Sequence, residues 1–240
     1  MKSRRILGSV LATVLASTSL VVVATASSPA SAVTPVETRI VARYPDRGIF
    51  SSYSMPVTYG DSISIYADVE GLVNGVWTDI YPGQITVTQQ LIGSKSATTV
   101  ATSDSAYLSK SITARGNADY TLTYSGATTS DDAYAYAPTA VTVRVKDIQR
   151  KLDVTPKSGR KKLGLAGKIS PKGTYRVIVL KKVGKKWKKY KGLRTTSRGT
   201  FFARLPAPSR RGQKILWKLA IPGSGAFSQT NSGVYYTTKY

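Results

Sequence analysis

Segments in which apolar and polar residues alternate recur along most of the chain. The clearest is Ser62–Val69, where apolar residues occupy positions 63, 65, 67 and 69 and polar residues occupy the positions between them. Successive side chains of a strand point to opposite faces, so this alternation predicts a half-buried strand of an antiparallel sheet. None of these segments shows a helical period. The pattern therefore predicts an all-β protein.

The predicted strands form two groups, with turn signals at intervals near ten residues. The strongest hairpin signal is Asn74-Gly75, since both residues tolerate the positive φ of a type I′ turn. The first group is predicted at residues 37–44, 62–69, 84–91, 97–102, 106–114, 120–125 and 141–146. The second is predicted at residues 162–169, 175–182, 186–191, 193–196, 201–205, 214–221 and 234–239. About seven short strands in roughly 110 residues are typical of a β-sandwich.

The two groups have similar internal spacing. Gly83–Val87 corresponds to Gly173–Val177, and the interval from Gly83 to Val141 is 58 residues against 61 from Gly173 to Val234. Repetition of this kind predicts a duplicated structural unit. We therefore expect two tandem antiparallel β-sandwiches, which the resemblance described below implies to be immunoglobulin-like.

Charge divides the chain at the same place. Residues 33–143 hold six Lys or Arg against ten Asp or Glu, a net charge of −4, whereas residues 144–240 hold 26 against two, a net charge of +24. Asp147 and Asp153 are the last acidic residues, so the boundary is expected between 146 and 156. This predicts an acidic, tyrosine-rich sandwich at residues 33–147, the N-terminal region, and a strongly basic one at residues 148–240, the C-terminal region.

Residues 1–32 have the pattern of a signal peptide. Lys2, Arg4 and Arg5 precede the apolar stretch Ile6–Ala24, and Pro29–Ala32 ends in a small-x-small cleavage pattern. We expect a secreted, extracellular protein that starts at Val33, with cell-wall association as an extension of that location. A retained signal anchor is the alternative, because nineteen residues nearly span a bilayer core of about 30 Å. No later segment has the length and hydrophobicity of a membrane span.

The most basic stretch of the chain is Tyr175–Arg194, YRVIVLKKVGKKWKKYKGLR. It predicts a hairpin of strands 175–182 and 186–191 joined by a turn at 183–185. Trp187 and Tyr190 are predicted to be structural aromatic residues that anchor the hairpin. The candidate polyanion-binding residues, expected to share one outward-facing field, are Lys181, Lys182, Lys185, Lys186, Lys188, Lys189, Lys191 and Arg194.

Three segments of the C-terminal region carry a family resemblance. Gly167–Pro171 (GKISP), Val177–Lys188 (VIVLKKVGKKWK) and Gly199–Phe201 (GTF) resemble the bacterial immunoglobulin-like repeats of secreted actinobacterial proteins. The resemblance covers residues 150–240 and extends to residues 34–145 through Tyr59–Asp61 and the strand at 120–124. It implies a Greek-key sandwich that serves as a spacer, adhesion or ligand-presentation module, with no catalytic residues to carry over.

Candidate catalytic and metal-binding groups are few. The chain has no histidine and no cysteine, which removes Ser-His and Cys-His nucleophiles, structural zinc and disulfides. Ser158–Lys161 has Ser-x-x-Lys spacing, but its lysine lies among other cations, which favours a solvated loop over the neutral base that a hydrolase needs. Asp68 with Glu70 and Asp131 with Asp132 lack the ligand ladder of a calcium loop. We predict a non-enzymatic protein without cofactor or metal; calcium binding stays a minor alternative.

The basic C-terminal region is the main functional signal. Clustered cations with Trp187, Tyr190 and Trp217 among them favour polyanions, because binding releases condensed counterions. Lysine does not recognise base edges bidentately, so binding to extracellular DNA is expected to be unspecific. The expected partners are anionic cell-wall polymers, acidic polysaccharides and, peripherally, anionic membrane surfaces. A passive spacer made soluble by lysine is the alternative, and carbohydrate binding by the tyrosine-rich region is the third hypothesis. The sequence does not predict an oligomeric state.

Overall fold

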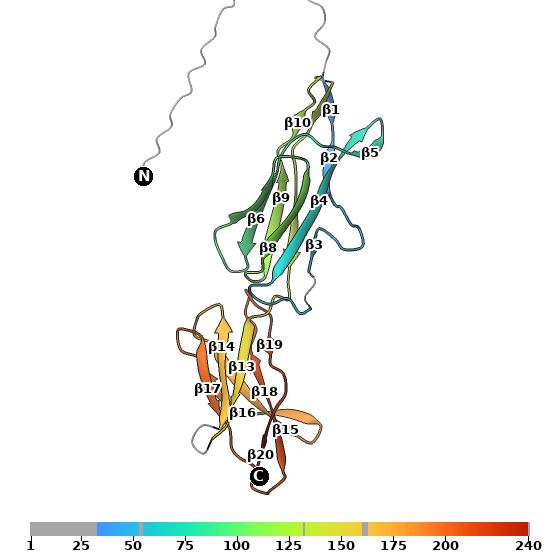
Figure 1. The fold of residues 1–240 in the computed structure, drawn as a ribbon. Helices are drawn as coiled ribbons and strands as arrows, with labels where there is room; N and C mark the ends of the chain where they lie inside the picture. Colours follow the sequence, from blue (N-terminus) through green and yellow to red (C-terminus); the bar gives the residue numbers. More distant parts are fainter. Residues whose placement is uncertain (1–32, 53–54, 132, 160–162, 240) are drawn as a thin grey trace, which may run out of the picture. The chain divides into compact units, whose positions relative to one another are not determined.

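The computed structural model describes residues 33–239 except residues 53–54, 132 and 160–162. The predicted signal peptide therefore lies outside the described residues. The described residues form strands and loops without a helix, which confirms the all-β prediction (Figure 1). Accordingly, this part of the chain contains no helix that is long and apolar enough to cross a membrane.

Two main sheets enclose the core of the N-terminal region. In one, β4 (Ser62–Val73) pairs with β2 (Thr38–Ala42), β3 (Phe50–Ser51), β5 (Val76–Asp79) and β8 (Tyr107–Thr113). The other has the order β12 (Thr139–Val145), β9 (Ala118–Tyr124), β6 (Ile85–Leu91) and β7 (Thr98–Ser103). A small third sheet comprises β1 (Thr34–Val36), β11 (Tyr134–Tyr136) and β10 (Ala127–Thr128). The inward residues of the two main sheets, Ile65 and Leu122 among them, form one buried cluster.

The C-terminal region is built in the same way. One sheet has the order β13 (Lys151–Lys157), β14 (Gly164–Ser170) and β17 (Thr200–Arg204). In the other, β15 (Arg176–Val183) lies between β16 (Lys186–Arg194) and β18 (Lys214–Ile221), and β18 also pairs with β19 (Thr230–Asn231) and β20 (Tyr235–Thr238). Leu165, Val179 and Trp217 belong to a second buried cluster between these sheets.

The two regions share one strand connectivity. The order β2-β4-β8 matches β13-β14-β17, and β12-β9-β6-β7 matches β20-β18-β15-β16. The register of both hairpins shifts at the same place, between Val87 and Thr88 in β6–β7 and between Val179 and Leu180 in β15–β16. This shared β-bulge aligns Val87 with Val179, two residues away from the predicted alignment with Val177.

Most predicted strands are present, and the differences have local causes. Asn74 and Gly75 have φ angles of 52° and 77°, as a type I′ turn requires, so the β4–β5 hairpin is confirmed. Strand β13 was not predicted; it begins within the stretch 146–156 in which the boundary is expected, and its inward Leu152 and Val154 alternate with polar residues. The separate strand predicted at 193–196 is wrong, because Gly192 pairs with Ile178 and lets β16 continue to Arg194.

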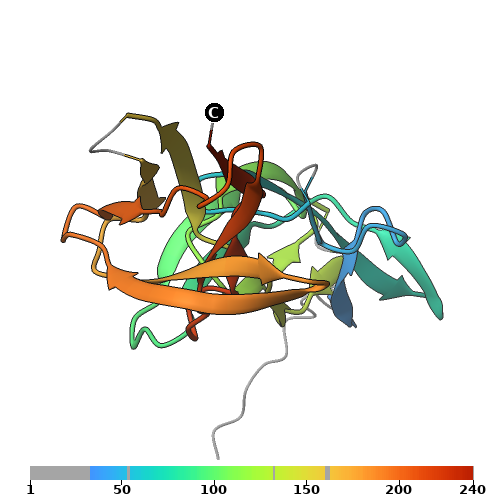
Figure 2. The ribbon, with the colours of Figure 1, turned by 90° about the horizontal axis from the view of Figure 1, so that it is seen from below.

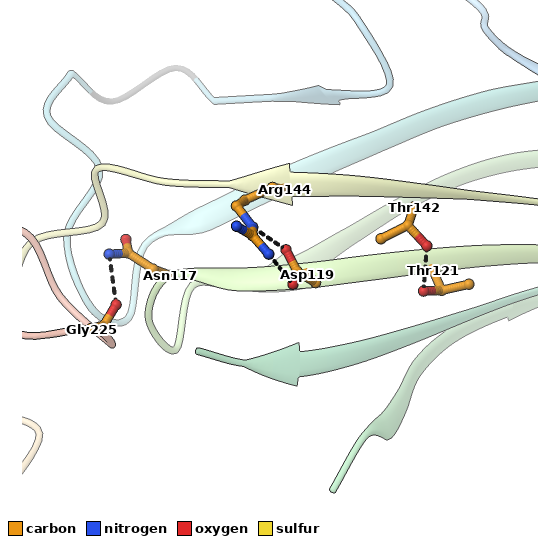
Figure 3. A network of polar contacts seen from close by, with 6 residues as sticks. All are labelled: Asn117, Asp119, Thr121, Thr142, Arg144 and Gly225. Atoms are coloured by element: carbon orange, nitrogen blue, oxygen red, sulfur yellow. Dashed lines mark hydrogen bonds and ion pairs between the residues drawn. The ribbon is translucent and has the colours of Figure 1, made fainter. Parts of the chain in front are cut away.

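Hydrogen bonds join the two regions around Asn117. Its side chain accepts a bond from the Ile148 backbone N–H at 3.0 Å and donates one to the Gly225 carbonyl at 3.2 Å (Figure 3). Phe227 belongs to the buried cluster of the N-terminal region although it lies far along the chain. These contacts tie the loop that contains Gly225 and Phe227 to the N-terminal region.

Candidate functional site

Hairpin β15–β16 carries the predicted polyanion-binding residues. Its strands are joined by the two residues Gly184 and Lys185, and Gly184 adopts the left-handed conformation with a φ of 58°. The hairpin continues past the last pair that β15 makes with β18, Lys181 with Trp217 (Figure 2). Val177 and Val179 are buried, so one face of β15 is attached to the core and the other faces away from it.

The β-bulge decides which residues of β16 lie on which face. Val179 pairs with Lys191 and Leu180 pairs with Lys189, so Tyr190 is the extra residue. Strict alternation would place Tyr190 on the same face as Gly192; the bulge places Lys189 there. Tyr190 instead packs against the buried Trp217, with ring centroids 5.1 Å apart in an edge-on arrangement.

We call the side of the β16-β15-β18-β20 sheet that points away from the core the basic face. Residues that pair directly across strands share a face, so this side follows from the register of Arg176 with Arg194, Leu180 with Lys189 and Leu180 with Lys218. Its basic residues are Arg176, Lys182, Lys189, Arg194, Lys214 and Lys218. Its apolar and aromatic residues are Ile178, Leu180, Trp187, Leu216 and Tyr236.

The structure divides the eight predicted cations between two faces and a turn. Lys182, Lys189 and Arg194 lie on the basic face, and Lys185 lies in the turn. The pairings place the other four on the opposite side of the hairpin: Lys181, Lys186, Lys188 and Lys191. The predicted stretch is therefore not one field by itself. Trp187 is half-buried and pairs with Lys182 on the basic face. Tyr190 instead packs against the buried Trp217, on the core side of the sheet.

Sequence reasoning missed three cations of the basic face, Arg176, Lys214 and Lys218. The signal for Arg176 was available, because it alternates with the buried Val177 and Val179. Lys214 and Lys218 lie on β18, which begins 20 residues after the end of the hairpin, and join the face only through the pairing of β18 with β15 and β20. Alternation within β18, where Trp217 and Leu219 are buried, would have indicated their outward direction but not their neighbours.

Lys191 is held by the fold. Its ammonium group donates a hydrogen bond to the carbonyl oxygen of Arg204 on β17 and lies 5.8 Å from the ring centre of Tyr190. Burial, and secondarily the nearby Arg204, lowers the pKa of Lys191. This lysine therefore links the two sheets of the C-terminal region and is less available to a ligand than the exposed cations of the basic face.

The described cations of the C-terminal region form no ion pair with an acidic residue. The ion pairs of the described residues are Arg39 with Glu70, Arg47 with Asp46 and Arg144 with Asp119, all in the N-terminal region. The bidentate bonds from Arg144 to Asp119 measure 2.6 and 2.7 Å and lower the pKa of Asp119 (Figure 3).

The only acidic residue of the C-terminal region is Asp153. It lies on the other sheet and pairs with Lys168 across β13 and β14, on the side away from the core. No ion pair occurs within the described part of residues 148–239. The positive charge of the basic face is therefore not neutralised by neighbouring carboxylates.

The basic face is hollowed next to its two arginines. The hollow has a volume of about 430 Å³ and is lined by Arg176, Lys189, Gly192, Leu193 and Arg194. Gly192 pairs with Ile178 and contributes no side chain to the face. Farther along the sheet, the Lys214 ammonium lies 5.4 Å from the ring centre of Tyr236, which is 61% exposed. The face thus combines cations, exposed aromatic surface and a concave site.

The tyrosine-rich region has a hollow of about 310 Å³ that bears on the carbohydrate hypothesis. Arg43, Asp68, Asp79, Tyr81 and Tyr107 are among its lining residues. Tyr81 is 74% exposed, and the Arg43 guanidinium lies 4.4 Å from the ring centre of Tyr107. Burial raises the pKa of Asp68, although Arg43 opposes this effect. Exposed aromatic faces beside carboxylates are groups that can contact a sugar.

The remaining candidate groups do not assemble into a site. Glu70 accepts a bond from Arg39 at 2.7 Å and so has a structural partner. Asp131 accepts a bond from the Ala133 backbone N–H, while Asp132 and Lys161 lie outside the described residues. Among the described residues, no three carboxylates gather closely enough to hold a metal ion. The Ser-x-x-Lys and calcium hypotheses gain no support from this geometry.

No model of a known protein family matches the chain, and no curated protein shows significant similarity to it. The resemblance to bacterial immunoglobulin-like repeats therefore stays a prediction, and the function has to be argued from the surface of the structure itself.

Proposed function

We propose that the chain is an exported, non-enzymatic protein of two tandem immunoglobulin-like sandwiches that binds anionic extracellular or cell-envelope polymers through its C-terminal basic face. The observation that carries this proposal is the set of six cations on one sheet face, none of which has an acidic partner among the described residues. The repeated strand connectivity supports the tandem-sandwich part of the proposal, and the pattern of residues 1–32 supports export.

A solubilising role explains this arrangement less well than binding does. Solubility requires charge on the surface but does not require that a cation be placed over an exposed aromatic ring. On the basic face, Trp187 and Tyr236 lie among the lysines, and Lys214 is placed over the Tyr236 ring. Desolvating this face against a polyanion would strengthen both the charge interactions and the aromatic contacts.

The geometry of the sheet suits an extended polymer. Neighbouring strands lie about 4.8 Å apart, and residues of one face recur about every 6.6 Å along a strand. Cations at these intervals can contact several charges of one chain without reading a sequence. Affinity then arises mainly from counterion release and decreases steeply with salt.

The test compares two triple variants of equal charge. Lys182→Ser/Lys189→Ser/Lys218→Ser removes three cations from the basic face, and Lys151→Ser/Lys157→Ser/Lys168→Ser removes three from the other sheet of the C-terminal region. Retention of the purified protein is measured on heparin, DNA and purified cell wall over a salt series. We expect the first variant to lose retention and its logarithmic salt dependence on DNA to decrease by about 0.7 to 0.9 for each lost contact.

The control variant is expected to remain close to the wild-type protein. Equal losses in both variants would indicate diffuse charge without a binding face. Absence of wild-type retention at low salt would contradict the proposal and favour the passive spacer.

A second candidate function is carbohydrate binding at the hollow that Tyr81 and Tyr107 line, because Tyr81 is highly exposed beside two carboxylates. This function predicts retention on a neutral polysaccharide that does not depend on salt and is lost in Tyr81→Ala. Unchanged retention of Tyr81→Ala, or none by the wild-type protein, would remove this candidate.

A further inference from the structure

We propose that the hollow at Gly192 is a subsite for a single tetrahedral oxyanion, a phosphate or sulfate ester group of the bound polymer. The inference builds on the proposed polyanion binding and adds a preferred charged group. Its main residues are Arg176, Lys189 and Arg194, which line the hollow together with Gly192. The hollow has a volume of about 430 Å³ and is shallow and open to solvent, so it could contact one charged group of a polymer without enclosing it.

The backbone does not explain the glycine at position 192. Its φ lies outside the left-handed region that favours glycine, and an added Cβ would meet only the Val177 carbonyl oxygen, at 4.0 Å. A Cβ atom would therefore fit both the backbone and the available space. Glycine within a strand is unfavourable in itself but is found at β-bulges, such as the nearby one at Tyr190, and where a ligand approaches the backbone closely.

The cations around Gly192 are not explained by the fold either. Arg176 and Arg194 pair directly across the strands, and like charges in such positions are destabilising. The side chains of Arg176, Arg194 and Lys189 form no hydrogen bond or ion pair within the described part of the chain. A bound anion would offset the repulsion between Arg176 and Arg194, because both guanidinium groups would be attracted to it.

The N-terminal region supplies an internal comparison at the same position. The shared β-bulge aligns Arg176 with Gln84 and Arg194 with Asp104. Gln84 donates a hydrogen bond to Asp104 at 3.0 Å, so this pair is satisfied within the fold. Likewise, Thr102 occupies the position of Gly192 and Thr99 that of Lys189. The strand plan therefore requires neither the glycine nor the three cations.

The arrangement of the three cations favours a tetrahedral group. Arg176 and Arg194 flank Gly192 on one side, and the β-bulge brings Lys189 to the other side. A phosphate or sulfate ester presents several oxygens in different directions, which suits convergent donors, whereas a carboxylate presents two in one plane. The arginine forks can bind pairs of oxygens, and lysine adds a point charge.

The decisive experiment fills the hollow without changing the charge. Gly192→Leu retains every cation, and Thr102→Leu makes the matched change in the N-terminal region. Binding of the full chain to polyphosphate, dextran sulfate and polygalacturonate is measured at several salt concentrations. For Gly192→Leu we expect binding of polyphosphate, dextran sulfate or both to fall about tenfold or more, since charged hydrogen bonds are lost.

The remaining arms separate the alternatives. Polygalacturonate binding should change little in Gly192→Leu, and Thr102→Leu should bind all three polymers as the wild-type protein does. A loss limited to polyphosphate or to dextran sulfate identifies whether the subsite prefers phosphate or sulfate groups. Unchanged binding of both polymers by Gly192→Leu overturns the subsite while salt-dependent wild-type binding preserves the proposed function. Absence of wild-type binding overturns both.

Circular dichroism and the thermal midpoint test whether Gly192→Leu is folded. If that variant unfolds, Arg176→Gln is compared with Lys168→Gln, which removes one charge elsewhere. The subsite predicts a larger loss for Arg176→Gln on polyphosphate and dextran sulfate than on polygalacturonate. Equal losses in the two variants would contradict it.

Discussion

The N-terminal and C-terminal regions share one strand order but differ in how the charged residues of their surfaces are paired. In the N-terminal region, Arg39, Arg47 and Arg144 each form an ion pair. In the C-terminal region, the described cations form none, although the strands that carry them are paired in the same order. The sheets therefore fix where side chains stand on each face, whereas the identity of those side chains decides whether the face is neutralised or left charged.

The interiors of the two regions differ less than their surfaces. Tyr120 of β9 and Trp217 of β18 occupy corresponding positions, and both are completely buried. The Tyr120 hydroxyl accepts a bond from Gln89 at 2.6 Å, and the Trp217 indole N–H donates one to the Thr237 hydroxyl at 3.0 Å. Each region thus places a large aromatic residue with one satisfied polar atom at the same point of its core.

The largest expected effect tests whether these two positions are equivalent. Trp217→Ala and Tyr120→Ala should each lower the free energy of unfolding by about 3 to 5 kcal/mol, because each leaves a cavity in a buried cluster and removes a buried hydrogen bond. Urea unfolding followed by far-UV circular dichroism measures the loss. Trp187 is half-buried on the basic face, so Trp187→Ala is the control and should lower the free energy of unfolding by less. A Trp217→Ala variant as stable as Trp187→Ala would break the equivalence.

An intermediate effect concerns stability at alkaline pH, to which Tyr124 of the N-terminal region contributes and the corresponding residue of the C-terminal region does not. Burial, with a contribution from Tyr136, raises the pKa of Tyr124 to about 12, and its hydroxyl donates a bond to the Pro82 carbonyl at 2.8 Å. The corresponding residue of the C-terminal region, Ile221, does not titrate. The unfolded phenol loses its proton near pH 10. The folded state retains it, so this contribution to stability is lost as the pH rises from about 10 to 12.

Tyr124→Phe removes this pH dependence. At pH 8 the variant should be less stable by about 0.5 to 1.5 kcal/mol, the usual net contribution of one hydrogen bond. Its deficit should shrink above pH 10, where the wild-type protein begins to lose stability. Urea midpoints of both proteins between pH 8 and pH 11.5 test this. A constant difference over that interval would contradict the raised pKa.

The smallest effect concerns the exposed ion pairs that distinguish the N-terminal region. Hydrogen bonding to Arg144 lowers the pKa of Asp119, so the stability that this carboxylate contributes is present above its ordinary pKa and lost as the pH falls through the lowered value. Asp119→Asn should therefore reduce the thermal midpoint slightly at pH 7, and this deficit should shrink as the pH is lowered below the ordinary pKa of an aspartate. Asp153→Asn, whose carboxylate has no ion pair in the described structure, is the control. A deficit of Asp119→Asn that does not shrink as the pH falls would contradict the ion pair as its cause.

The part of the fold that sequence reasoning predicted depends on local patterns. Alternation located β4, and Asn74-Gly75 indicated the turn that follows it, since side-chain direction and backbone φ are properties of neighbouring residues. Strand β13 escaped prediction because it combines only two half-buried apolar residues, Leu152 and Val154, with charged neighbours and a proline. A weakly alternating edge strand is difficult to distinguish from a linker without its partner strand.

The candidate site was predicted in composition but not in arrangement. The sequence showed that hairpin β15–β16 is basic, and yet four of its eight cations point away from the basic face. Arg176, Lys214 and Lys218 complete that face from positions that composition did not single out. The reason is that a face is defined by pairing between strands, which may be separated by a long stretch of chain, rather than by density of charge along one segment.

The sequence by itself determined the all-β class, the periodicity of most strands and the concentration of positive charge after residue 144, because each of these follows from local order or from composition. Only the tertiary structure decided which cations share a surface. Tyr190 is an extra residue in β16, and it shifts the alternation of side chains between the two faces of the strand. Lys189 therefore lies on the same face as Gly192 and the two arginines. A bulge exists only relative to a partner strand, so its consequence for the surface appears only when the strands are paired.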